Sequence, residues 1–212
     1  FFKKMSEQNL PLPVVHDELQ HHASGCYAVH SGIKRWNRKA EHVLMAAEKF
    51  SSVAAAVTGQ PYPGDFGRAW KNVLFNQFHD IMAGTSLESA YEDACVSNSE
   101  ALSIAQRNTN LALQAIAWQI GIEAEEGMIP FVVFNPNAWE TLSAVEMELG
   151  GWKPDMALLD PENRVVPYQV IQAEATCNGR TRICFVTRLP ALGYAVFRLA
   201  HREEAAVVDL PE

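Results

Sequence analysis

The chain has 212 residues, of which 48% are hydrophobic and 20% are charged, and its formal net charge is −8 at pH 7. This composition is typical of a globular protein with a buried core and excludes a disordered chain. No apolar run approaches the roughly 20 residues of a membrane-spanning helix, and no basic face is present to neutralise phosphates, so we expect neither membrane nor nucleic acid as a partner.

Residues 1–32 show no consistent periodicity. Pro11 and Pro13 interrupt any helix there, and Gly25 and Gly32 mark turns. We interpret this segment as the end of a preceding domain. Without that domain its apolar side chains should be poorly covered, namely those of Phe1, Phe2, Leu12, Val14 and Val15.

Two helices are predicted in the next part of the chain. From Ile33 to Gly59, apolar residues recur at alternating steps of three and four, which indicates one buried stripe of a long helix. A second helix begins with Asp65 as its N-cap and continues to a turn at Gly84. We interpret the charged residues of the first helix as a solvated face, namely Lys34, Arg35, Arg38, Lys39, Glu41 and Glu48.

A third helix is predicted to begin at a capping box formed by Thr85 and Glu88 and to end at Gly121. Because the connections are short, residues 33–122 are expected to form an antiparallel three-helix bundle. The expected core comprises Trp36, Val43, Phe50, Val73, Leu74, Leu102 and Ile116.

After Gly127 the periodicity changes to two, which predicts β-strands. The predicted strands are residues 131–134, 143–149, 165–171, 182–187 and 194–199. They favour part of an antiparallel sandwich. The expected fold class is therefore α+β and multidomain, with a three-helix bundle followed by part of an antiparallel β-sandwich, and the expected domains are residues 1–32, 33–122 and 128–212.

The four cysteines form no Cys-x-x-Cys unit and are too sparse for a disulfide framework, so we interpret Cys26, Cys95, Cys177 and Cys184 as free thiols. The sequence has no Asn-x-Ser/Thr glycosylation acceptor. Its first residue is not a methionine, and the residues Phe1 to Lys4 lack the long apolar core of a signal peptide, which suggests a piece of a longer protein. Free thiols and absent acceptors favour the cytoplasm.

The most informative stretch runs from Asn76 to Ser86 and reads Asn-Gln-Phe-His-Asp-Ile-Met-Ala-Gly-Thr-Ser. It sets His79 beside Asp80 where a helical pattern gives way to a turn. An imidazole can bind a metal, and a carboxylate can accept hydrogen bonds from a polar substrate. On spacing alone, a solvated or capping pair is the alternative.

The same run resembles the Asn-Gln-Phe-His-Asp-Ile-x-x-Gly-Thr-Ser block of glycoside hydrolase family 38, the retaining α-mannosidases. Upstream, the passage from Glu18 to Glu41 is similar to the family's Glu-Leu-Gln…Gly-x-Tyr…Lys…Asn-Arg…Glu pattern. Downstream, Val132 to Pro136 and Leu189 to Tyr194 resemble two signatures of its β-rich region. The blocks follow the family order along nearly the whole chain.

This resemblance implies that His79 matches the family's last zinc ligand and Asp80 a carboxylate that binds sugar hydroxyls. It also implies that the nucleophile, the acid/base residue and a His-x-Asp zinc motif belong to an N-terminal α/β domain, of which residues 1–32 are the end. No His-x-Asp occurs in this sequence. We therefore expect no catalytic residue in this chain, and an inactive isolated fragment.

His22 lies just before Gly25. Eukaryotic members of the family tend to carry aromatic residues just before the glycine that matches Gly25, where one wall of the sugar site lies. We consider His22 a candidate for substrate contact, with a surface or supporting position as the alternative. The implied partners are a mannoside or oligosaccharide substrate and the missing N-terminal domain of the same polypeptide, and the implied cofactor is zinc. Alternative functions are a non-catalytic carbohydrate-binding or scaffolding module, and a relative acting on a different mannoside.

Overall fold

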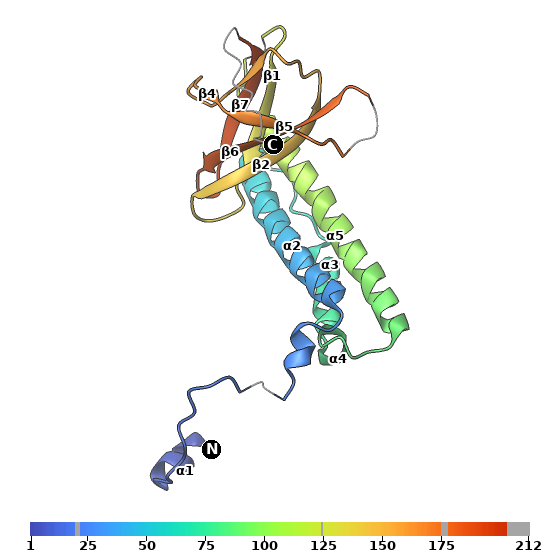
Figure 1. Cartoon of the computed structure of the whole chain (residues 1–212), viewed down its shortest axis with the longest axis vertical. Helices are drawn as coiled ribbons and strands as arrows, with labels where there is room; N and C mark the ends of the chain where they lie inside the picture. Colours follow the sequence, from blue (N-terminus) through green and yellow to red (C-terminus); the bar gives the residue numbers. More distant parts are fainter. Residues whose placement is uncertain (20–21, 124, 175–177, 203–212) are drawn as a thin grey trace, which may run out of the picture.

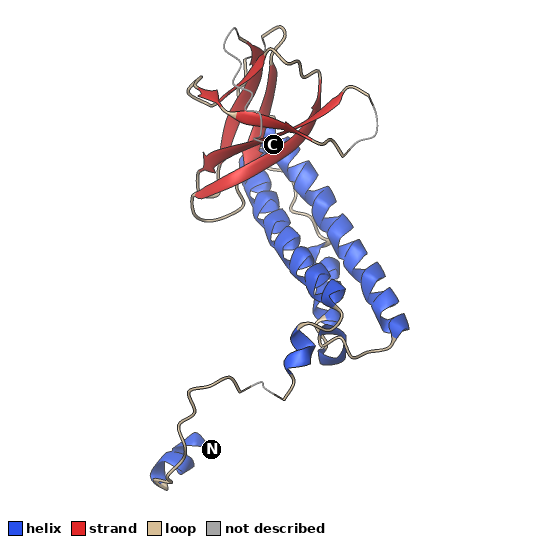
Figure 2. Cartoon of the chain, viewed as in Figure 1, coloured by secondary structure: helices blue, strands red, loops and turns tan. Residues whose placement is uncertain are grey.

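The computed structural model describes residues 1–19, 22–123, 125–174 and 178–202. An N-terminal arm leads into packed helices, and a β-domain lies at the far end of these helices (Figure 1). The helices are α1 (Phe2–Glu7), the 3₁₀ helix η1 (Ser24–Tyr27), α2 (Ser31–Thr58), α3 (Phe66–Asn76), α4 (His79–Met82) and α5 (Glu88–Ala117). The strands are β1 (Ile129–Phe134), β2 (Thr141–Gly150), β3 (Met156–Leu159), β4 (Val165–Val166), β5 (Tyr168–Ile171), β6 (Arg180–Leu189) and β7 (Tyr194–His201). Helices followed by antiparallel sheets confirm the expected α+β class (Figure 2).

The two long helices α2 and α5 pack against each other, and the shorter α3 packs against both. In their shared core α2 and α5 each contribute two alanines and one larger aliphatic side chain, and α3 contributes one alanine and two larger side chains, namely Ala40, Leu44, Ala47, Phe66, Ala69, Val73, Ala101, Ile104 and Ala105. Small residues allow the long helices to approach closely. Each large apolar side chain that is fully buried contributes about 1.5–3 kcal/mol.

The exact three-helix bundle is not confirmed, because the predicted second helix is broken. Helix α3 ends at Asn76, Phe78 has an extended backbone (ψ 140°), and α4 begins at His79. Leu74, expected in the core, is 60% exposed. The buried apolar residues of α3 are Phe66, Ala69 and Val73, and Leu74, one residue beyond Val73, points away from them.

The predicted N-cap position of Asp65 is confirmed, but its side-chain capping bond is absent, and the predicted capping box of Thr85 and Glu88 is wrong. Asp65 is the N-cap of α3 but makes no capping bond, because its carboxylate binds Arg107 and accepts a hydrogen bond from Asn108 Nδ2 at 2.9 Å, both on α5. Helix α5 begins at Glu88 without a side-chain cap. The amide of Ser86 donates instead to the hydroxyl of Tyr91 at 3.0 Å.

The β-domain has two antiparallel sheets, one in the order β1-β7-β3-β4 and one in the order β2-β6-β5. Aromatic side chains meet between the sheets, with the rings of Phe185 and Phe197 5.0 Å apart. The segment predicted as one strand, 165–171, is divided by Pro167 into β4 and β5, which belong to different sheets. Proline has no amide hydrogen for a sheet ladder, so it marks the crossing point.

Two of the motifs that resemble family 38 bind each other. Asn135 is 2% exposed, and the two N–H donors of its Nδ2 are shared among the carbonyls of Trp139 at 2.9 Å, Pro190 at 2.9 Å and Leu189 at 3.3 Å. Its backbone amide donates to Gly193 O at 2.8 Å. These motifs are therefore part of the structure of the β-domain.

The apolar residues of the arm are uncovered, as the sequence predicted. Phe1, Phe2 and Val14 are 87%, 84% and 78% exposed, and α1 has no buried residue. None of the described helices is both long and apolar enough to cross a membrane. The interpretation of residues 1–32 as the end of a preceding domain, and the other domain bounds, stay predictions.

Candidate functional site

The break between α3 and α4 exposes a histidine and a carboxylate together. The side chains of His79 and Asp80 are 78% and 56% exposed, and His79 Nε2 lies 3.5 Å from Asp80 Oδ1. Both residues belong to α4, which is only four residues long. So short a helix is not stable by itself, and its geometry must come from its neighbours.

Residues 78–84, which include α4, are called the turn below. Helix α5 packs against one side of this turn. Ile81 is 8% exposed and packs with Ile33, Tyr91 and Ala94. The hydroxyl of Tyr91 lies 3.4 Å from Asp80 O and 3.5 Å from Ile81 O, towards which it donates. His30 stacks on the Tyr91 ring at 3.9 Å, so the start of α2 is joined to the same cluster.

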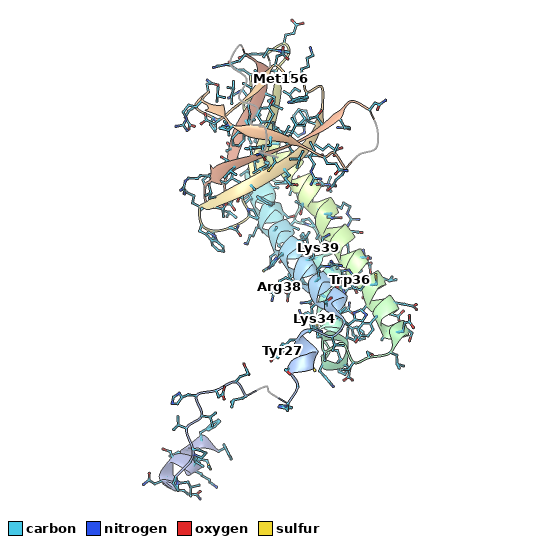
Figure 3. All side chains as sticks on the ribbon, in the orientation of Figure 1. Tyr27, Lys34, Trp36, Arg38, Lys39 and Met156 are labelled. Atoms are coloured by element: carbon cyan, nitrogen blue, oxygen red, sulfur yellow. The ribbon has the colours of Figure 1, made fainter. Side chains whose placement is uncertain are left out.

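Helix α2 holds the turn from the other side. Lys34 Nζ donates to Met82 O at 2.7 Å and to Val29 O at 2.5 Å. Gln77 Nε2, two residues before His79, donates to Asn37 Oδ1 at 3.1 Å and to Glu41 Oε1 at 2.9 Å. Figure 3 shows Lys34 near Tyr27, at the end of α2 that faces η1.

A close backbone approach closes the turn. Gly84 has a φ of +81°, and a Cβ at this position would lie 2.5 Å from Val29 O. Only glycine fits such a conformation and such a distance. The chain just before α2 is therefore packed directly against the end of the turn that holds His79 and Asp80.

Asp80 also lines a surface groove of about 390 Å³ between α3, α4 and α5. Phe75 and Phe78, which are 73% and 52% exposed, supply aromatic rings to this groove. Asp93 and Ser97 supply polar groups. Aromatic faces beside carboxylate and hydroxyl groups suit a ligand with both C–H faces and hydroxyls.

The described residues do not make a complete metal site. No group of three or more His, Cys, Asp and Glu side chains able to hold a metal occurs among them. His79 and Asp80 carry the ligand atoms that zinc uses, an imidazole nitrogen and a carboxylate oxygen, but zinc takes four ligands. The pair can therefore supply part of a zinc site and not the whole.

The remaining site prediction, His22, lies exposed in the chain just before η1. Its neighbour His21 lies outside the described residues. A role for His22 in substrate contact stays a prediction.

Sequence reasoning missed the residues that support the turn, Lys34, Gln77 and Tyr91. One signal was present, because Lys34, Asn37 and Glu41 follow the helical spacing of three and four residues that places them on one face.

The region that contains His79 and Asp80 is similar to a domain of known proteins. The family model described as the alpha mannosidase middle domain matches residues 21–116. These residues are therefore similar to the middle domain of alpha-mannosidases. The matched residues contain η1, α2 to α4, α5 up to Ile116, and both His79 and Asp80.

Individual relatives agree with this family. Alpha-mannosidase 2C1 of Homo sapiens is 30% identical over 138 residues, which are 64% of this chain and 13% of the human protein. Alpha-mannosidase 2C1 of Mus musculus is 37% identical over 73 residues, which are 34% of this chain and 7% of the mouse protein. The chain thus spans a small part of the curated relatives it matches.

Two solved structures from Enterococcus faecalis have the same fold. One is a protein in glycosyl hydrolase family 38 and the other an alpha-mannosidase of strain V583, each with a TM-score of 0.70 and 20% identity. Both matches cover 99% of this chain, and 28% and 29% of the other chains. The resemblance to family 38 α-mannosidases that the motifs predict is confirmed.

Proposed function

We propose that this chain is part of a zinc-dependent retaining α-mannosidase that hydrolyses terminal α-mannosides. The observation that carries the proposal is the exposed His79–Asp80 pair, held on a turn that α2 and α5 support from both sides. Exposed polar side chains on a supported backbone suit a site that another part of the polypeptide completes. The names of the curated relatives favour an α-mannosidase.

In this proposal His79 supplies one zinc ligand, and Asp80 accepts hydrogen bonds from sugar hydroxyls. The groove that Asp80 lines with Phe75 and Phe78 supports the second role, because sugars present both hydroxyls and C–H faces. His22 is proposed as a further substrate contact. A zinc ion bound with the help of His79 would hold and polarise oxygen atoms of the substrate.

The two carboxyl groups of a retaining glycosidase stand about 5 Å apart, one as nucleophile and the other as acid and then base. We assign both to the N-terminal part of the polypeptide, outside these residues. The purified chain of residues 1–212 is accordingly expected neither to hydrolyse aryl α-mannosides nor to retain zinc through dialysis. Turnover by this fragment, after removal of contaminating enzymes, would contradict the assignment.

The roles of His79 and Asp80 can be separated in the full-length protein. His79→Ala should lower zinc content and activity together, because a metal ligand is lost. Asp80→Asn should retain zinc but lower kcat/KM, because an amide is a weaker acceptor for sugar hydroxyls than a carboxylate. His42→Ala, on the exposed face of α2, is the matched control and should change neither quantity.

The measurements are zinc content by mass spectrometry of the purified protein and steady-state kinetics on an aryl α-mannoside. Equal zinc loss in His79→Ala and Asp80→Asn would contradict the division of roles. A full-length protein that binds mannosides without turnover would favour the non-catalytic alternative instead.

A further inference from the structure

Three polar residues of α2 lie on one face of the helix and point to one segment of the chain. Lys34, Asn37 and Glu41 are separated by three and four residues, so their side chains project from adjacent turns. Lys34 binds the carbonyl of Met82, and Asn37 and Glu41 both accept from the amide of Gln77. The contacted residues stand on either side of the stretch that contains His79 and Asp80.

The contact made by Lys34 is the strongest of these in chemical terms. A charged ammonium donates to two carbonyls, one of which, Met82 O, belongs to the last residue of α4. Carbonyls at a helix C-terminus have no partner within the helix, and a cation there is favourable. The second carbonyl, Val29 O, is the atom packed against Gly84. Lys34 therefore binds both of the segments that meet at this close contact.

The apolar core of α2 does not include Lys34. Its fully buried side chains are Ile33, Ala40, Leu44, Ala47 and Ala54, which face α3, α4 and α5. Lys34 is only partly buried. Replacing Lys34 should leave the packing of the helices intact and release the turn alone.

We propose that Lys34 is a positioning residue, which sets the orientation of the turn carrying His79 and Asp80 and thereby the retention of the metal, with Asn37 and Glu41 supporting the same turn through Gln77. The link to the metal rests on the proposed function, whereas the link between Lys34 and the turn rests on contacts of this chain alone.

The test uses Lys34→Met in the full-length protein, because methionine keeps the length and helix propensity of lysine but has no donor. Lys39→Met is the matched control, on the exposed side of the same helix (Figure 3). Hydrogen exchange of peptides covering residues 78–84 reports on the turn, and peptides covering α2 report on the helix. Zinc retention is measured by the rate of metal transfer to a chelator, alongside His79→Ala.

In Lys34→Met, exchange in residues 78–84 should be about tenfold faster or more, as expected for loss of a charge-assisted hydrogen bond, while exchange in α2 is unchanged. Zinc transfer should become faster in the same variant. Lys39→Met should match the wild type in both measurements. Lys34→Arg, which keeps a charged donor, should restore slow exchange at least in part.

Exchange in residues 78–84 that is the same in Lys34→Met and Lys39→Met would overturn the proposal. So would faster exchange spread along α2, which would mean a general loss of stability. Faster exchange of the turn with unchanged zinc transfer would also overturn it, provided that His79→Ala loses zinc. Retention of zinc by His79→Ala would refute the proposed function on its own, and the exchange result would then still decide whether Lys34 holds the turn.

Discussion

The carbonyl oxygen of Val29 lies so close to Gly84 that a Cβ on Gly84 would be 2.5 Å from it. This contact joins the chain entering α2 to the chain leaving α4. Lys34 strengthens it by donating to Val29 O and to Met82 O. The geometry of the candidate site therefore depends on two segments that are more than fifty residues apart in the sequence.

Gly84→Ala should disturb this contact, because the new methyl group collides with backbone and the φ of +81° is strained for alanine. We expect a loss of about 1–3 kcal/mol of unfolding free energy and weaker zinc retention by the full-length protein. Gly67→Ala is the matched control: Gly67 lies within α3 with no neighbouring atom within 4 Å of its added Cβ, and alanine favours a helix. Urea unfolding of both variants tests this, and equal stability of the two would contradict the contact.

Asn135 should be a residue on which the β-domain depends. Asn135→Ala would remove the donor for three carbonyls in the loops that follow β1 and β6, at a cost of about 1–3 kcal/mol. Asn137→Ala is the control, because Asn137 enters this region through its backbone amide and carbonyl, which alanine retains. The measurement is denaturant unfolding, and a neutral Asn135→Ala variant would mean that the loops are held by other contacts.

The turn between β3 and β4 should make stability depend on acid pH. Burial raises the pKa of Asp160, but hydrogen bonds from the amide and guanidinium of Arg164, together with its charge, outweigh this and lower the pKa below its ordinary value. A lowered pKa in the folded state gives stability that is present above the ordinary pKa of about 4 and is lost as the pH falls through the folded value.

Asp160→Asn should therefore be less stable than the wild type by about 1–2 kcal/mol at neutral pH, with the difference disappearing in acid. Unfolding experiments on both proteins between neutral pH and pH values well below 4 test this. A difference independent of pH would show that the carboxylate charge is not the cause.

The sequence predicted the elements where periodicity is strong and missed those that tertiary contacts decide. The stripe of α2 and the alternation of β2, β6 and β7 are visible in the chain itself. Strand β3 was missed because all four of its residues are buried, so it has no alternation. The break at Phe78 follows a locally helical pattern, and it is accompanied by contacts of Gln77 with α2 that no local sequence signal reveals.

The candidate site, too, was predicted from the sequence only in part. His79 and Asp80 were found from a motif, and the structure exposes both. Lys34 was interpreted as part of a solvated face, because its partners, Val29 O and Met82 O, are backbone atoms that carry no sequence signature. The supporting residues of a turn are therefore harder to predict than the residues that the turn displays.

The most direct test of the central claim is a crystal structure of the full-length protein with anomalous scattering measured at the zinc edge. We predict one strong peak about 2.0–2.1 Å from an imidazole nitrogen of His79, with the other ligands supplied by residues outside this chain and Asp80 beside the sugar site. A bound zinc ion whose ligands do not include His79, or a protein in which His79 faces solvent away from any metal, would contradict the account.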